Sequence, residues 1–171
     1  MRVAGAVCAI VVSTLSAVAA QSPQVCRAVP HQQLEALLPM LPGFTRQLPQ
    51  GETDNVDAPV SRTTVDYEAP SVAATISIEL MDSCRLPEML AQLREFLTTG
   101  APATSGTAMR SIPVRGFPAY EEWTAESRHG EVHVLVADRF LVKVTGSLVA
   151  DLKTVEDAAG AIDLQKLAAL K

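Results

Sequence analysis

The chain has 171 residues, with 14 basic and 19 acidic side chains and a net charge of −5 at pH 7. An acidic chain without clusters of Lys or Arg argues against nucleic acid or an anionic membrane surface as its partner. A length of this order predicts one domain.

The first twenty residues predict a secretory signal peptide. Met1-Arg2 is a short basic start, Val3–Leu15 is almost continuously apolar, and Ala17–Ala20 offers small residues for cleavage. The apolar run is short for a membrane-spanning helix, so no membrane span is expected after cleavage; an uncleaved anchor is the alternative. We therefore expect a signal peptide over residues 1–20 and a single exported domain over 21–171.

Two cysteines remain in the predicted mature chain, because Cys8 lies inside the signal peptide. In an oxidising compartment, Cys26 and Cys84 predict a structural disulfide. The alternative is a redox pair, which usually has Cys-x-x-Cys spacing.

The first half of the predicted domain contains a helix, three strands and a second helix. The strongest strand signal is the alternation of apolar and polar residues over Val72–Met81, and the strongest helix signal is a continuous apolar face over Leu86–Leu97. The other expected elements are a helix starting at Pro30, a short strand at Phe44–Leu48, a solvated loop at Gln50–Pro59 and a more polar strand at Val60–Glu68, near an edge of the sheet.

The second half predicts four strands and a closing helix. A strand over Thr107–Val114 precedes a meander within Arg115–Gly146, which contains the only Trp. A helix is expected from Asp151 or Thr154 to about Ile162, followed by a turn or two capped by Asp163.

Two turns set the register of the meander. With Arg128 and His129 as the first loop, Trp123 would lie opposite Val134 and would share a face with the neighbouring valines. At Ala137–Arg139 a three-residue loop or a bulge is expected, because it sets Val136 against Phe140 and keeps the apolar residues on one face.

These elements predict an α+β fold. It consists of a single antiparallel sheet of about six to seven strands with a long C-terminal meander, packed against two to four helices. The expected order is helix, three strands, helix, four strands, helix.

No motif in the chain indicates catalysis, a metal site or a cofactor. His31, His129 and His133 do not form a recognised set of metal ligands, and Gln50–Pro59 does not match a calcium-binding loop. The serines have no Gly-x-Ser-x-Gly context, and no glycine-rich phosphate loop is present. We expect no catalytic residues, no metal ligands, no cofactor and no enzymatic activity.

A candidate ligand or partner surface is centred on Trp123. Glu121 shares its face and is either at the rim of the core or beside a shallow pocket, and Arg139 is a candidate partner for its carboxylate. The candidate surface comprises Phe117, Tyr120, Glu121, Trp123 and Arg139. The opposite, polar face of the meander is a second candidate docking surface, or is simply solvated or covered by a helix.

The order of elements over Leu86–Leu170, with Gly116-Phe117-Pro118 ahead of a long meander and a closing helix, resembles the PsbP-like α/β/α sandwich group of exported accessory proteins. The resemblance implies a non-catalytic, assembly-type role and carries over no site residue. The Ala-rich, Lys-poor composition and the predicted signal peptide are typical of a bacterial protein that is periplasmic or secreted.

Three function classes follow. The first is a binding or accessory module acting on another envelope protein. The second is a carrier of a small apolar or amphipathic ligand, with a pocket lined by Trp123, Phe117 and the helix Leu86–Leu97. The third is a hydrolase that uses carboxylates, which requires two facing acids in one cleft.

Overall fold

The structure is a computed structural model that describes residues 26–56, 59–84, 91, 93–95, 97 and 108–171. The predicted signal peptide and most of the predicted helix Leu86–Leu97 lie outside the described residues.

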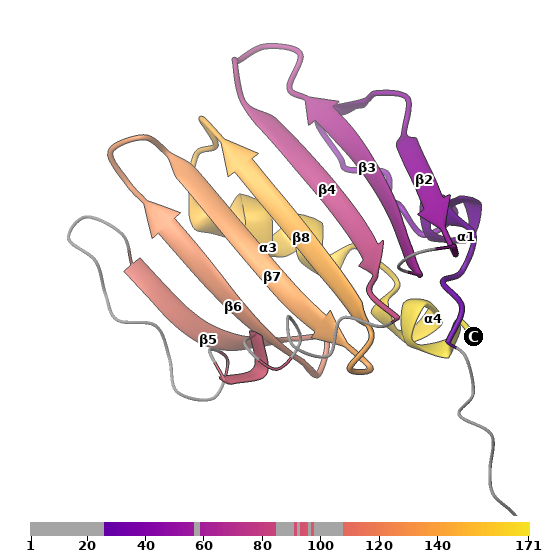
Figure 1. Ribbon diagram of the computed structural model, residues 1–171. Helices are drawn as coiled ribbons and strands as arrows, with labels where there is room; N and C mark the ends of the chain where they lie inside the picture. Colours follow the sequence, from indigo (N-terminus) through magenta and orange to yellow (C-terminus); the bar gives the residue numbers. More distant parts are fainter. Residues whose placement is uncertain (1–25, 57–58, 85–90, 92, 96, 98–107) are drawn as a thin grey trace, which may run out of the picture.

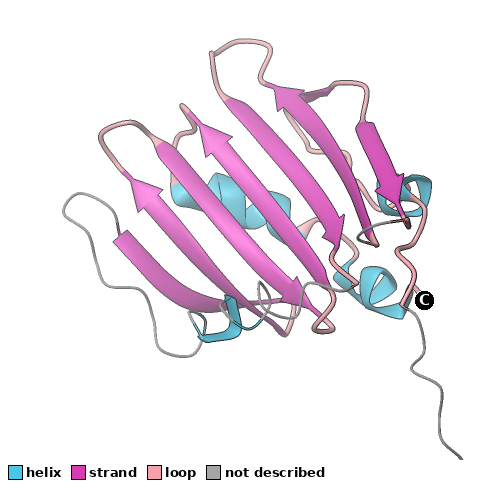
Figure 2. Ribbon diagram, in the orientation of Figure 1, coloured by secondary structure: helices cyan, strands magenta, loops and turns pink. Residues whose placement is uncertain are grey.

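A single layer of strands dominates the molecule (Figures 1 and 2). Neighbours follow the order β1-β3-β4-β8-β7-β6-β5, β2 also pairs with β3, and each pairing is antiparallel. The strands are β1 (Thr45–Arg46), β2 (Gln50–Asp54), β3 (Val60–Glu68), β4 (Thr75–Asp82), β5 (Ala108–Val114), β6 (Phe117–Thr124), β7 (His129–Val136) and β8 (Phe140–Ser147).

The predicted α+β class and the long C-terminal meander β5–β8 are confirmed, but the sheet has eight strands rather than six to seven. The additional strand is β2, in the segment predicted to be a solvated loop. Every residue of β2 is exposed, and its backbone pairs with β3 from Gln50↔Thr64 to Asp54↔Val60. Backbone pairing holds this strand, together with hydrogen bonds from the hydroxyls of Ser61 and Thr63 to the carbonyls of Glu52 and Gln50, so no alternation of apolar residues predicts it.

Helices α1 (His31–Glu35), α3 (Leu152–Gly160) and α4 (Leu164–Ala169) pack on one face of the sheet, and Figure 1 shows α3 behind the strands and α4 near their lower ends. The predicted caps are confirmed: the side chains of Asp151 and Asp163 accept hydrogen bonds from the backbone N–H groups of Thr154 and Lys166, each at 3.0 Å. Within the described residues, no helix is long and apolar enough to cross a membrane.

The core lies between this face and the helices. Side chains of alternate strand residues point into it and are fully or almost fully buried, as the alternation predicts. They include Ile76, Ile78 and Leu80 of β4, Val132 and Val134 of β7, and Val142 and Val144 of β8.

The first turn of the meander differs from the prediction. Trp123 lies opposite Gly130, not Val134, and the turn consists of Ala125–Arg128. Arg128 adopts a left-handed φ of 51°, and its guanidinium donates to the carbonyls of Leu148 and Val149 at 2.6 and 2.9 Å. A contact distant in sequence therefore fixes the turn. Trp123 still shares a face with Val132 and Val134, as predicted.

The second turn agrees with the prediction. Val136 lies opposite Phe140 and Val134 opposite Val142, with three residues between the strands. Ala137 and Asp138 both adopt positive φ, which closes the short loop.

Helix α3 approaches the sheet over a pair of glycines. Gly130 and Gly146 lie directly opposite each other on β7 and β8. A Cβ at Gly146 would lie 2.6 Å from Cγ2 of Val155, and one at Gly130 would lie 3.3 Å from the same atom. The absence of side chains on this pair lets α3 pack close to the strands.

We expect Gly146→Ala to destabilise the fold by about 1–3 kcal/mol, because the added methyl group overpacks the contact with Val155. Urea unfolding monitored by circular dichroism measures the loss. Val155→Ala makes room, so the double variant should lose less than the sum of the two single losses. Strict additivity would contradict the proposed contact.

Candidate functional site

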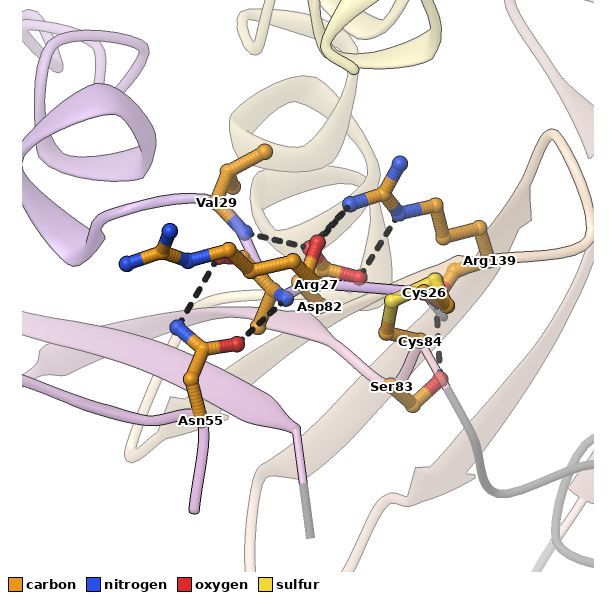
Figure 3. The surroundings of a disulfide bond; sticks show 9 residues. Cys26, Arg27, Val29, Asn55, Asp82, Ser83, Cys84 and Arg139 are labelled. Carbon is orange, nitrogen blue, oxygen red and sulfur yellow. Dashed lines mark hydrogen bonds and ion pairs between the residues drawn. A yellow bond between two sulfur atoms is a disulfide. The ribbon is translucent and has the colours of Figure 1, made fainter. Parts of the chain in front are cut away.

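A buried ion pair lies beside the disulfide at one end of the sheet (Figure 3). Asp82, the last residue of β4, is fully buried, and both of its oxygens accept hydrogen bonds from Arg139 in the β7–β8 turn. Arg139 Nε donates to Oδ1 at 2.9 Å and Nη2 donates to Oδ2 at 2.7 Å. Such a bidentate pair fixes the plane of the guanidinium.

The same carboxylate holds the leader, defined as residues 26–30. The N–H of Val29 donates to Asp82 Oδ2 at 2.9 Å, and the carbonyl of Arg27 accepts from Arg139 Nη2 at 3.0 Å. The side chain of Asn55 bridges the N–H and carbonyl of Ala28.

The predicted disulfide between Cys26 and Cys84 is present, with a Cα–Cα distance of 5.8 Å. The leader is thus attached to the end of the sheet by a covalent bond and by hydrogen bonds to Asp82, Arg139 and Asn55.

A second buried carboxylate, Glu121 of β6, lies on the helix-covered face and has a side-chain exposure of only 1%. Arg110 of the edge strand β5 pairs with Glu121 and also with Glu156 of α3, in the latter case at 3.2 Å. Burial raises the pKa of Glu121, and a hydrogen bond with the Glu156 carboxyl raises it further, whereas Arg110 opposes the shift. These contacts hold β5 to α3.

The carboxylate-dependent hydrolase requires two facing acids in one cleft, and Glu121 and Glu156 are such a pair on the helix-covered face. A hollow of about 390 Å³ beside them is lined by Glu156 and Arg115 but not by Glu121. Glu121 is therefore buried beneath α3, where a substrate in that hollow would not contact its carboxylate.

The sheet face opposite α1, α3 and α4 carries two rows of mainly polar side chains, which we call the open face. The rows cross the sheet in register. They consist of Asp66, Ser77, Thr145, Glu131 and Glu122, and of Thr64, Glu79, Lys143, His133 and Tyr120.

Glu131 is at the centre of the open face. Its carboxylate lies 2.8 Å from His133 Nε2, 3.0 Å from Lys143 Nζ and 3.4 Å from His129 Nε2. Hydrogen bonding to His133 and Lys143 lowers the pKa of Glu131 to about 2. The ring of His133 in turn stacks on Tyr120, with a centroid separation of 4.4 Å.

Stability should fall on acidification because of Glu131. Its folded-state pKa lies below the ordinary 4.5, so the stabilisation is present above about pH 4.5 and is lost as the pH falls toward 2. We expect Glu131→Gln to cost about 2 kcal/mol at pH 7, with the difference from the unmodified protein narrowing below about pH 4.5 and closing only as the pH reaches about 2. Urea unfolding across this range measures it.

Glu126→Gln is the matched control, because it removes the same charge from an exposed turn position of the same hairpin. Its effect should stay within about 0.5 kcal/mol at pH 7. A gap between the Glu131 variant and the unmodified protein that stays constant with pH would contradict the role given to the Glu131 network.

The structure does not bring the five residues of the sequence-predicted surface together. Phe117 and Trp123 pack against the core on the helix-covered face, where Glu121 also lies. Tyr120 belongs to the open face, and Arg139 lies in the β7–β8 turn.

The proposed pairing of Arg139 with Glu121 is wrong. Arg139 pairs with Asp82, and Glu121 pairs with Arg110. Sequence reasoning did not single out Asp82, Arg110 or Glu156. The cluster on β7 was detectable, because His129, Glu131 and His133 alternate and therefore share a face.

Among the residues that the structure describes, no group of three or more His, Cys, Asp or Glu side chains is arranged to hold a metal ion. Comparison with protein-family models, with curated proteins and with solved structures finds no match to this chain.

Proposed function

We propose that the protein is an exported, non-catalytic binding module that docks on another envelope protein through the open face. The observation that carries the proposal is the Glu131 cluster with its stacked Tyr120–His133 pair. The assembly-type role implied by the PsbP-like resemblance agrees with it.

The open face is suited to docking because its side chains already fix one another. A side chain that is ordered before binding loses less conformational entropy when a partner arrives. Tyr120 contributes an aromatic ring of the kind enriched at protein interfaces, and burial raises the pKa of its hydroxyl to about 12.

The open face combines charges of both signs. Arg62 pairs with Glu79 at 3.1 Å at one side, and Lys143 pairs with Glu131 nearer the centre. A mixed pattern of this kind favours a protein surface of complementary charge over a uniformly charged polymer.

Export is supported by two features. The predicted signal peptide precedes the domain, and the Cys26–Cys84 disulfide is of the kind that persists in an oxidising compartment.

Site-specific photo-crosslinking in the native host tests the docking face. A benzophenone amino acid at Thr145, on the open face, is expected to give a discrete protein adduct. The same probe at Lys153, exposed on α3 on the other side of the sheet, should give none. Lys143→Glu should reduce the Thr145 adduct by at least about fivefold, because it places like charges together at the interface.

Lys153→Glu is the matched charge-reversal control and should leave the Thr145 adduct unchanged. Adducts of equal yield from both faces, or an adduct insensitive to Lys143→Glu, would overturn docking through the open face.

A further inference from the structure

A cavity of about 900 Å³ lies where the leader, the β7–β8 turn and the C-terminal residues meet. Its volume falls in the range of about 300–1,000 Å³ that is usual for small-molecule sites. It is distinct from the open face and from the Trp123 pocket predicted for a ligand carrier. Its lining residues are Cys26, Arg27, Ala28, Val29, Pro30, Thr53, Asn55, Arg139, Leu170 and Lys171.

The side chains lining the cavity have the opposite charge to the chain as a whole. Arg27 and Arg139 contribute guanidinium groups and Lys171 an ammonium group, Arg139 being paired with the buried Asp82, and no Asp or Glu is among the lining residues that the structure describes. The net charge of the whole chain is −5. Asp82 is fully buried behind Arg139 and does not line the cavity. The cavity therefore attracts a negatively charged ligand.

Arg139 presents a guanidinium whose orientation is already fixed. Its Nε and Nη2 donate to Asp82 and to the carbonyl of Arg27, whereas Nη1 makes no hydrogen bond to the residues that the structure describes (Figure 3). The side chain is 22% exposed, and its Cζ lies 4.9 Å from the ring centroid of Phe140. A donor held in this way binds a carboxylate without first having to be ordered.

The remaining walls supply a further donor and an apolar surface. Asn55 Nδ2 donates to Ala28, which uses one of its two hydrogens. Pro30 and Leu170 provide apolar contact. A ligand that fits these groups carries a carboxylate at one end and an apolar portion at the other.

We propose that this cavity binds a small organic carboxylate, with the carboxylate on Nη1 of Arg139 and the apolar portion against Pro30 and Leu170. This inference goes beyond docking through the open face and does not rest on it.

Octanoate is the probe, and octanamide is its uncharged match. Isothermal titration calorimetry on the full exported domain is expected to give saturable octanoate binding with a Kd of about 1 mM or lower. Octanamide should bind at least about tenfold more weakly. Shifts of N–H signals in the NMR spectrum on adding octanoate should centre on the backbone amides of Ala28 and Val29 and on the guanidinium Nε–H of Arg139.

Replacing Arg139 also breaks a buried ion pair, so the informative variant is Arg27→Glu. The Arg27 side chain is exposed, and among the described residues its only hydrogen bond is the one that its backbone carbonyl accepts from Arg139. Charge reversal there should weaken octanoate binding by about five- to tenfold, while Lys153→Glu on α3 should leave it unchanged.

Three results would overturn the proposal. They are the lack of saturable octanoate binding up to about 10 mM, equal affinities for octanoate and octanamide, and shifts centred on the open face instead of the leader.

Discussion

Replacing Asp82 with alanine is expected to destabilise the fold by about 3–5 kcal/mol at pH 7. The change leaves the guanidinium of Arg139 without its counter-charge in a largely buried position and leaves the N–H of Val29 without an acceptor. An unpartnered buried charge costs more than the pair itself contributes, which is why the expected loss is large. Urea unfolding of the oxidised protein measures it.

The reciprocal variant distinguishes the ion pair from a general effect of mutation at this site. Arg139→Met should cost a similar amount, because it leaves Asp82 buried without its partner, whereas Asp82→Leu combined with Arg139→Met should recover part of the loss. Asp138→Ala is the matched control: it removes an exposed carboxylate from the same turn, and its cost should stay near zero to 1 kcal/mol. A loss below about 1 kcal/mol for Asp82→Ala would contradict the role given to the pair.

The parts of the fold that sequence predicted are those fixed by local chemistry. Alternation of apolar residues over Thr75–Asp82 gives the strand and its buried face, because the side-chain period of a strand is two. Asp151 and Asp163 cap their helices through contacts only three residues away. The β7–β8 register follows from keeping apolar residues on one face.

The β6–β7 register depended on information that is not local. A shorter turn would also have kept Trp123 and the valines on one face, so the alternation could not decide between the two. The observed turn is selected by Arg128, which binds carbonyls of Leu148 and Val149 about twenty residues later, and by the space that Gly130 leaves for Trp123.

The ion pairs of the candidate site could not be predicted either, because they also depend on contacts between residues distant in sequence. Asp82 and Arg139 are 57 residues apart, and Arg110 and Glu156 are 46 apart. Asp82 ends β4, Arg139 lies in the β7–β8 turn, Arg110 is on the edge strand β5 and Glu156 is on α3, so only the tertiary arrangement of these elements brings the partners together. The disulfide was predictable without spatial information, because only two cysteines remain after the predicted signal peptide.

Removing the disulfide, by replacing Cys26 and Cys84 together with serine, should cost about 4 kcal/mol. The bond joins residues 58 apart, and cross-linking a loop of that length restricts the unfolded chain strongly. The folded state should remain, because Asp82, Arg139 and Asn55 still hold the leader. Chemical denaturation at 25 °C compares the variant with the oxidised protein.

Dithiothreitol provides the internal control. It should lower the stability of the unmodified protein to that of the double-serine variant and leave the variant unchanged, because the variant contains no bond to reduce. The leader also lines the 900 Å³ cavity, so octanoate should stabilise the oxidised protein more than the variant if the bond helps to shape that wall. A cost below about 1 kcal/mol would contradict this account, because it would mean that the cross-link restricts the unfolded chain much less than the length of its loop implies.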